Sequence, residues 1–250
     1  MPLLETVGSG SSRTYGLNAN LFPRSSAYID ASTLVYIPFD SDLRENKTGE
    51  LPTQNINSGI QSVSGYNALR LNLQKTAYTS TKISTNLAPL NGNVNWTVEY
   101  WAYVFDGGNG LATELEMGRD TYYQTGLLSR WSAGTGTQSS NWYWRGNPYD
   151  PQIGSRTHNS WIHVAIVGQS GTLRHYVNGS QVGSATPSST GTGWDGNPAG
   201  FWLGGSQHTD PAGEGQTANM AMRKLRISNT ARYLNGSSFT SSSVYPIDAI

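Results

Sequence analysis

The chain has 250 residues, no cysteine, and 16 basic residues balanced by 16 acidic ones. The missing cysteines exclude a disulfide scaffold, a thiolate metal site and cysteine catalysis. A net charge of zero argues against nucleic acid and anionic membrane surfaces as partners. Only 13% of the residues are charged, whereas 11% are aromatic and 29 are glycine. This composition predicts an all-β protein with many turns, long enough to bury one sizeable core.

Residues 1–27 differ in composition from the rest and are predicted to form an N-terminal arm. A Gly/Ser run covers 8–12, Pro23 breaks any regular structure after that run, and the apolar residues are too sparse to build a core. We expect the arm to order against a partner or the domain's own surface and to anchor or assemble the protein, with a disordered leader as the alternative. The residues assigned to assembly are Leu3, Leu4, Val7, Leu17, Leu21 and Phe22.

Neither a secretory signal nor a membrane span is predicted. The N-terminus lacks a basic start followed by an apolar run, and no segment reaches the ~18 consecutive apolar residues of a span. We therefore expect synthesis and folding in a cytoplasm, without membrane insertion.

Alternating apolar and polar residues predict β-strands along residues 28–250, the expected domain. The pattern covers 33–39, 68–73, 94–104, 161–167, 201–205 and 220–227. In 94–104, Trp96 and Tyr100 share one predicted face, and Glu99 and Trp101 share the other. Segments 106–120 and 186–200, rich in small polar residues, are predicted to be loop tips.

Local signals add a hairpin, a bulge and one short helix. Asn178-Gly179 separates two alternating segments, 173–177 and 180–184, which predicts a type I′ turn. Met222 and Leu225 are three positions apart in an otherwise alternating strand, as a β-bulge would place them. The best short helix candidate is 230–233. Together the patterns predict an antiparallel all-β architecture with two sheets face to face.

Several segments, in order along the chain, resemble laminin-G-like, concanavalin A-like domains. They are Thr97-Val98-Glu99-Tyr100-Trp101, Trp161-Ile162-His163-Val164-Ala165, 171–179, Trp202-Leu203-Gly204-Gly205 and 222–227. The triplet Ala231-Arg232-Tyr233 is similar to the tail of copies carried by bacteriophage structural proteins. Many members carry an acidic pair where this chain has Arg223 and Lys224, so a contact through those acids cannot be carried over.

The resemblance, which covers about residues 28–250, implies a jelly-roll sandwich. Members of the family bind glycans or proteins, and some are glycoside hydrolases or lyases. Fold alone therefore does not decide the function.

A glycosidase needs two carboxylates held about 5–5.5 Å apart for retaining hydrolysis. The nearest match is Glu114-Leu115-Glu116, which puts two acids on one face of a strand without a third in register. We interpret them as solvated carboxylates on a strand face. No nucleophile-elbow motif is present either. The sequence predicts that the protein is not an enzyme.

Aromatic and polar residues concentrate in 142–150, where sugar C–H faces would stack on rings and polar side chains would hold hydroxyl groups. Packing in a core or subunit contact is the alternative, since Trp and Tyr serve there as well. Alternation separates Tyr143 from its two Trp neighbours. The candidate carbohydrate-binding residues are Trp142, Trp144, Arg145, Asn147, Tyr149 and Asp150, extended by Tyr122, Tyr123 and Trp194.

No cofactor is predicted, with calcium as the alternative because acidic side chains lie in Gly- or Pro-rich loops. The candidates are Asp106, Asp120 and Asp150; Asp195 and Asp210 lie in similar loops. Aspartate in a turn usually caps its own backbone. The four histidines show no ligand spacing for zinc: His158, His163, His175 and His208.

These features predict a non-enzymatic bacteriophage virion surface protein, either a head decoration or a tail-associated spike or fibre module. It would be made in the host bacterial cytoplasm and located on the virion surface. Expected partners are further copies of itself, preferably in a trimer, other capsid or tail proteins, and a host-surface glycan. The second hypothesis is a glycan-binding adhesin for host-surface polysaccharide, and the third a glucanase-like or lyase-like enzyme.

Overall fold

The structure is a computed structural model that places part of the chain. It describes residues 29–43, 52, 54–71, 80–83, 85, 87–105, 110–117, 127–133, 140–144, 147–153, 157–186, 200–204, 219–234, 236–241 and 245. The predicted arm, 1–27, and its six assembly residues lie outside the described residues. In four strands, 54–56, 127–133, 140–144 and 147–153, only the backbone is described.

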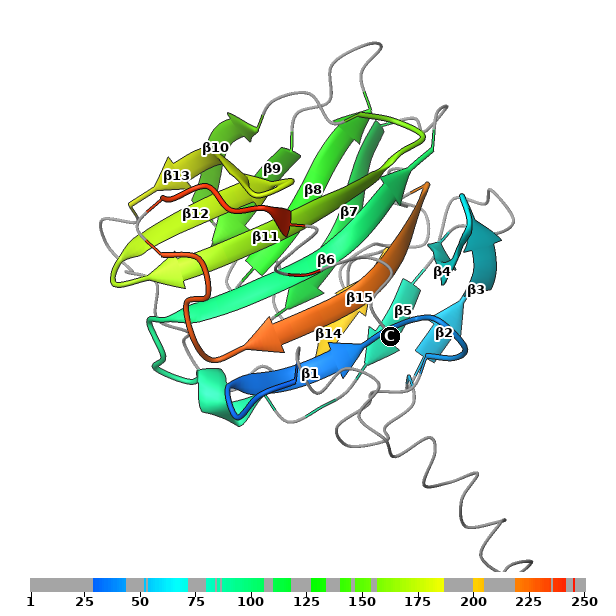
Figure 1. The fold of residues 1–250 in the computed structure, drawn as a ribbon, viewed down its shortest axis with the longest axis horizontal. Coiled ribbons are helices and arrows are strands. Elements are labelled where there is room, and N and C mark those ends of the chain that lie inside the picture. Colours follow the sequence, from blue (N-terminus) through cyan, green and yellow to red (C-terminus); the bar gives the residue numbers. More distant parts are fainter. Residues whose placement is uncertain are drawn as a thin grey trace, which may run out of the picture.

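The described residues form two antiparallel sheets packed face to face, as Figure 1 shows. The first sheet has the order β13-β12-β11-β6-β15-β4-β3, and β1 also pairs with β15. Its strands are β1 (Thr33–Ile37), β3 (Ser58–Val63), β4 (Tyr66–Leu71), β6 (Trp96–Val104), β11 (Trp161–Gln169), β12 (Thr172–Val177), β13 (Ser180–Ala185) and β15 (Met220–Ser228).

The second sheet has the order β10-β9-β8-β7-β14-β5-β2. Its strands are β2 (Gln54–Ile56), β5 (Ser80–Ile83), β7 (Gly110–Met117), β8 (Leu127–Ala133), β9 (Ser140–Trp144), β10 (Asn147–Ile153) and β14 (Phe201–Leu203). A 3₁₀ helix, η1 (Ala88–Leu90), precedes β6. The predicted antiparallel two-sheet jelly-roll sandwich is confirmed.

The core lies between the sheets and follows the predicted alternation. On β6, Trp96, Val98 and Tyr100 are fully buried in the central hydrophobic cluster. Leu115 of β7 and Phe201 of β14 meet them from the second sheet. Residues between these positions face outward, which leaves one outer face on each sheet. The two faces predicted for segment 94–104 are therefore confirmed.

The hairpin predicted at Asn178-Gly179 is present. Asn178 and Gly179 both have positive φ, 50° and 82°, which the type I′ turn between β12 and β13 requires. The same conformation joins β3 to β4 at Ser64-Gly65 and β11 to β12 at Ser170-Gly171. The Asn178 side chain also accepts a hydrogen bond from the backbone N–H of His163 at 2.8 Å, which ties the turn to β11.

The β-bulge predicted in the last strand is present. The pairing of β15 with β6 shifts register between Arg223 and Arg226. Lys224 occupies the left-handed region with φ 52°, and its N–H donates to the carbonyl of Pro38 at 3.1 Å. The bulge therefore keeps Met222 and Leu225 both in the core despite their three-residue spacing.

Two local predictions are wrong. Residues 230–233 are irregular instead of helical. The hydroxyl of Thr97 donates to the carbonyl of Thr230 at 2.8 Å and accepts from the N–H of Arg232 at 3.0 Å, so a side chain takes the place of helical partners. The sequence predicts a loop tip for segment 106–120, but 110–117 forms β7, which pairs with both β8 and β14.

Candidate functional site

The last described part of the chain lies across the outer face of the first sheet. This C-terminal segment comprises residues 229–234, 236–241 and 245, and Figure 1 shows it running in orange and red in front of β11 and β12. Its Tyr233 and Phe239 stack at 3.8 Å and contact Tyr176 of β12. The N–H of Phe239 donates to the carbonyl of Gly179 at 2.9 Å. The segment thus closes over a face rich in aromatic and charged residues.

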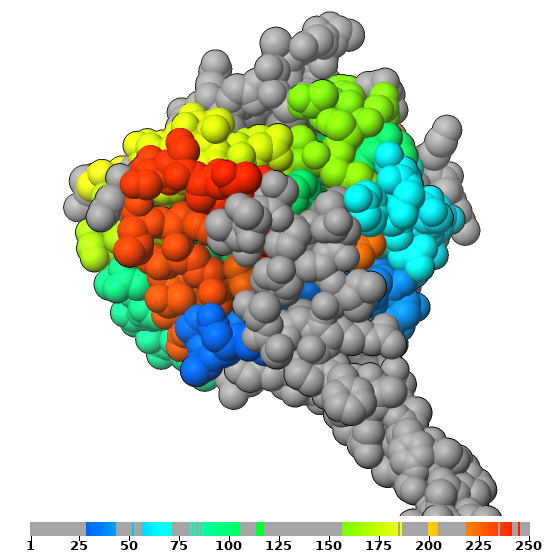
Figure 2. All heavy atoms as spheres, in the orientation of Figure 1, coloured from blue at the N-terminus to red at the C-terminus, as the bar shows by residue number. Residues whose placement is uncertain are grey.

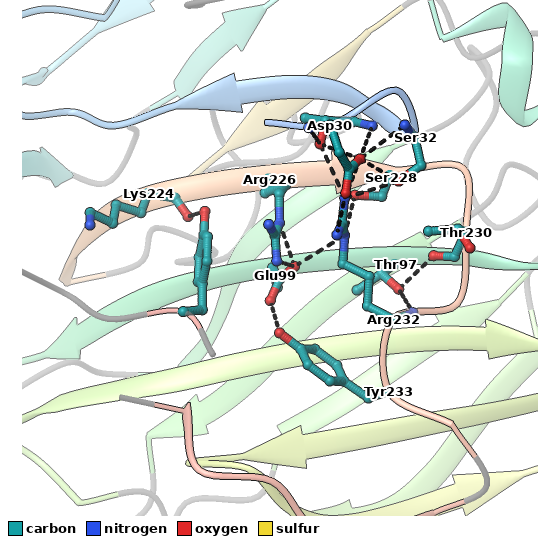
Figure 3. Close-up of polar contacts among 12 residues, drawn as sticks. Asp30, Ser32, Thr97, Glu99, Lys224, Arg226, Ser228, Thr230, Arg232 and Tyr233 are labelled. Atoms are coloured by element: carbon teal, nitrogen blue, oxygen red, sulfur yellow. Dashed lines mark hydrogen bonds and ion pairs between the residues drawn. The ribbon is translucent and has the colours of Figure 1, made fainter. Parts of the chain in front are cut away.

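Glu99 of β6 is the centre of a buried polar network beneath this segment (Figure 3). Arg226 of β15 lies opposite it in the strand register, with Nη2 at 2.6 Å from Oε1. The hydroxyl of Tyr233 donates to the other carboxylate oxygen, Oε2. His163 of β11 contacts the same oxygen through Nε2 at 3.3 Å. All four side chains are buried, so the hydrogen bonds and the ion pair among them take the place of contacts with bulk water.

The network keeps its acid charged and its phenol neutral. Burial alone would raise the pKa of Glu99, but the charge of Arg226, with the contacts of His163 and Tyr233, outweighs it and lowers the pKa from 4.5 to about 2. Burial, together with the negative charge of Glu99, raises the pKa of Tyr233. Tyr233 therefore stays a hydrogen-bond donor, and Glu99 stays a carboxylate.

Arg232 clamps the C-terminal segment to the start of the domain. Its guanidinium forms a bidentate pair with Asp30, both N–O distances being 2.9 Å. Nη2 also donates to the hydroxyls of Ser32 and Thr33, and Nε donates to Ser228. Hydrogen bonding from Arg232 lowers the pKa of the Asp30 carboxyl group. The Ala-Arg-Tyr triplet thus supplies two consecutive anchors, one at Asp30 and one at Glu99.

Tyr245 adds an anchor at the opposite end of the segment. It is fully buried, and its hydroxyl donates to the carbonyl of Lys224 at 2.7 Å. Its own carbonyl accepts from the indole of Trp101 at 2.8 Å. The guanidinium of Arg226 lies 4.3 Å from its ring centroid. Since Glu99 and Tyr245 are both inaccessible to solvent, we assign the network to stability and not to ligand binding.

The two acids considered as a catalytic pair do not share a face. β7 bulges between Thr113 and Leu115, and the Glu114 carboxylate accepts a hydrogen bond from the core residue Tyr100 at 2.7 Å. Glu116 pairs with Trp202 on the outer face of the second sheet. Both acids are buried, so their interpretation as solvated carboxylates is wrong. The bulge turns Glu114 into the interior of the sandwich.

The predicted carbohydrate-binding residues lie outside the part of the chain whose side chains are described. Tyr122, Tyr123, Arg145 and Trp194 fall in undescribed segments, whereas Trp142, Trp144, Asn147, Tyr149 and Asp150 lie in strands described by backbone alone. The register aligns positions 142 and 144 with Leu115 and Met117, and position 143 with Glu116. These assignments stay predictions.

The calcium candidates lie outside the described side chains as well. Asp106 and Asp120 fall in undescribed segments, as do Asp195, Asp210 and His208, and Asp150 is described by its backbone alone. Within the described residues no group of three His, Asp or Glu side chains is arranged to hold a metal ion. His163 and His175 are buried in strands. In the same part of the chain, no helix is long and apolar enough to cross a membrane.

A second cluster on the outer face of the first sheet reaches the surface. One row of paired positions crosses four strands: Arg70 opposite Ala221, Ala221 opposite Tyr103, and Tyr103 opposite Trp161. We call the cluster the aromatic–arginine surface; it consists of Tyr66, Arg70, Tyr103, Phe105, Trp161 and Arg223. Its four aromatic side chains are all half-buried. Sequence alternation predicted the face of Tyr103, but it did not predict that these side chains meet across β4, β15, β6 and β11.

Comparison with known proteins identifies the family. A family model described as the concanavalin A-like lectin/glucanases superfamily matches residues 75–235, well over half of the chain. The chain belongs to this superfamily. No curated protein sequence matches it.

Solved structures with the same fold include carbohydrate-binding domains. Domain 4 of AbnA, an extracellular GH43 arabinanase from Geobacillus stearothermophilus solved with arabinotriose, shares 16% identity; the match covers 89% of this chain and all of that domain, with a TM-score of 0.59. The binding domain of botulinum neurotoxin D/C shares 10% identity over 80% of this chain and 49% of that one, with a TM-score of 0.57. A structure of botulinum neurotoxin type C, whose cell entry depends on two ganglioside molecules, shares 11% identity over 85% and 50%, with a TM-score of 0.56. At these identities the likeness shows the fold.

Proposed function

We propose that this superfamily member is a non-enzymatic carbohydrate-binding module. The observation that carries the proposal is the half-buried aromatic surface on a fold shared with an arabinotriose-bound domain and with ganglioside-dependent toxin domains. Aromatic rings that keep part of their surface in water suit the C–H faces of sugars. The separation of Glu114 from Glu116 supports a binding role over hydrolysis, because the pair considered from sequence points to two sides of its sheet.

We further propose that the module is displayed on a bacteriophage virion and assembles through residues 1–27. The support is the Ala231-Arg232-Tyr233 triplet, which resembles the tail of phage-borne copies. In this fold the triplet fastens the C-terminal segment to Asp30, directly after the proposed arm. The C-terminal segment would then fix the start of the sandwich close to the point where the assembly arm ends.

The assembly proposal is tested by light scattering on the full chain and on a variant beginning at Ser26. We expect a trimer for the full chain and a monomer for the shortened one. A monomer in both cases would refute an assembly arm and favour the adhesin hypothesis, a free-standing glycan-binding module.

Two predicted carbohydrate-binding residues, Trp142 and Trp144 of β9, distinguish the adhesin from a purely structural decoration. In an adhesin that binds through these two residues, Trp142→Ala combined with Trp144→Ala abolishes polysaccharide binding while the far-ultraviolet circular dichroism stays that of the folded protein. In a decoration, the folded double variant still enters virions and shows no sugar phenotype.

A further inference from the structure

One arginine on the outer face of the first sheet differs from neighbouring arginines in the groups that its guanidinium contacts. Arg226 and Arg232 each have a carboxylate oxygen within 3 Å, from Glu99 and Asp30. Arg70 instead donates to the carbonyl oxygens of Leu71 and Met220 and to the amide oxygen of Asn219. Within the described chain, no carboxylate forms an ion pair with Arg70. Among the described residues, its positive charge is therefore held in place without a carboxylate partner.

The surroundings of Arg70 make that charge costly. The side chain is half-buried, and its guanidinium lies 4.1 Å from the ring centroid of Phe105. Burial lowers the pKa of Arg70, as expected for a cation partly removed from water. A ligand carboxylate placed beside it would relieve this cost. The cation–π contact with Phe105 also restrains the position of the guanidinium.

The hydrogen-bond geometry leaves a suitable edge of the guanidinium available. Nη1 donates to the carbonyl oxygens of Leu71 and Met220, and Nη2 donates to the amide oxygen of Asn219. A guanidinium has five N–H donors, so Nε–H and the second Nη2–H have no acceptor among the described residues. These two nitrogens are neighbours, and such a pair grips a carboxylate through two parallel hydrogen bonds.

Aromatic rings surround the same position. Trp161 meets Tyr103 at 5.5 Å and Tyr66 at 6.2 Å between ring centroids, and Tyr103 meets Phe105 at 4.8 Å. In Figure 2 the cyan β3–β4 hairpin and the lime-green start of β11 border this end of the sheet, and orange atoms of β15 are visible beside the hairpin. Aromatic rings of this kind suit the C–H face of a sugar. A sugar stacked in this way turns its substituents toward a neighbouring hydrogen-bond donor.

From this juxtaposition we propose that the aromatic–arginine surface binds an acidic saccharide, with the sugar ring against Tyr66 and Trp161 and its carboxylate held by Arg70. The inference rests on the proposed carbohydrate-binding function and deepens it by naming the site and the charge of the sugar. Arg223, whose guanidinium lies 5.1 Å from the Tyr66 ring centroid, adds positive potential at the same end of the sheet.

The test measures binding of the full chain to three carboxylated probes, tetragalacturonate, tetramannuronate and 3′-sialyllactose, by isothermal titration calorimetry. The control for each probe is its methyl ester, which keeps the sugar rings and removes the charge. We expect at least one acid to bind about ten-fold or more tightly than its ester, because charge-assisted hydrogen bonds are the strong ones. That preference falls as salt is added, since the carboxylate contact is partly exposed.

Two substitutions test whether the acidic saccharide binds at the aromatic–arginine surface. Arg70→Gln should remove the preference for the acid, and Tyr66→Ala should weaken both forms by a similar factor. Arg174→Gln is the matched control, because Arg174 is a half-buried arginine of β12 in the same sheet, bonded to Gln169. We expect it to bind like the unaltered chain. Melting followed by circular dichroism establishes that each variant is folded; if Arg70→Gln unfolds, the acid–ester comparison and Tyr66→Ala decide the question.

Failure of this inference is distinguishable from failure of the proposed function. Equal binding of acids and esters, or an acid preference that survives Arg70→Gln in a folded protein, overturns the acidic site and leaves carbohydrate binding in place. Absence of binding to all three acids also overturns the acidic site. Absence of binding to neutral and acidic members of a glycan array overturns the proposed function itself.

Discussion

Replacing Glu99 by glutamine tests whether the buried network stabilises the sandwich. The amide has the same shape as the carboxylate, but it leaves the charge of Arg226, whose side chain is 3% exposed, without its partner. Removing one member of a buried ion pair costs about 3–5 kcal/mol. A domain of this kind is stable by only about 5–15 kcal/mol, so the loss should be large in urea unfolding followed by tryptophan fluorescence.

Asp30→Asn is the matched control for Glu99→Gln. Its carboxylate also pairs with an arginine, Arg232 of the C-terminal segment, but the Asp30 side chain is 51% exposed. Exposed pairs contribute about 0.2–1 kcal/mol, so this variant should unfold near the urea midpoint of the unaltered chain. A cost below about 1 kcal/mol for Glu99→Gln, equal to that of the control, would refute the assigned role of the network.

The same network predicts sensitivity to acid. The pKa of Glu99 is lowered from 4.5 to about 2 in the folded protein, so its contribution is present above pH 4.5 and is lost as the pH falls toward 2. The shift corresponds to roughly 3 kcal/mol at about 1.4 kcal/mol per pH unit. Urea unfolding at a series of pH values should show this loss in the unaltered chain and less of it in Glu99→Gln. Equal slopes in both proteins would contradict the assignment.

Two further experiments test the packing of the C-terminal segment and the interaction between Glu99 and Arg226. In Gly179→Ala a Cβ would lie 1.7 Å from the carbonyl oxygen of Phe239, whereas in Gly65→Ala, also at positive φ, the Cβ meets nothing within 4 Å. We expect Gly179→Ala to lower the melting temperature further, and similar shifts would show that the segment does not press on this turn. In a double-mutant cycle, Glu99→Gln with Arg226→Met should cost less than the sum of the single changes in urea unfolding; additivity would show that the two charges do not interact.

The framework of the sandwich follows from local sequence signals. Alternation along segment 94–104 predicts which side chains enter the core, because a strand turns successive residues to opposite faces. The dipeptide Asn178-Gly179 and the three-residue spacing of Met222 and Leu225 predict a turn and a bulge for equally local reasons.

The closed outer face could not be predicted in this way. Glu99 reads as an outward-facing acid, and only its partners from distant parts of the chain, Arg226 and Tyr233, make it a buried ion. The same holds for residues 230–233, where Thr97 supplies the hydrogen bonds that a helix would have provided. The aromatic–arginine surface likewise depends on which strands become neighbours. The sequence signal of this network is a charged residue, Glu99, within a strand of aromatic and apolar residues.

The central claim, carbohydrate binding without catalysis, is tested most directly by exposing the full chain to a polysaccharide and oligosaccharide array while measuring newly formed reducing ends. We predict retention on at least one glycan and no release of reducing ends on prolonged incubation. Release of reducing ends, abolished by Glu116→Gln, would contradict the claim and establish an enzyme that cleaves glycosidic bonds.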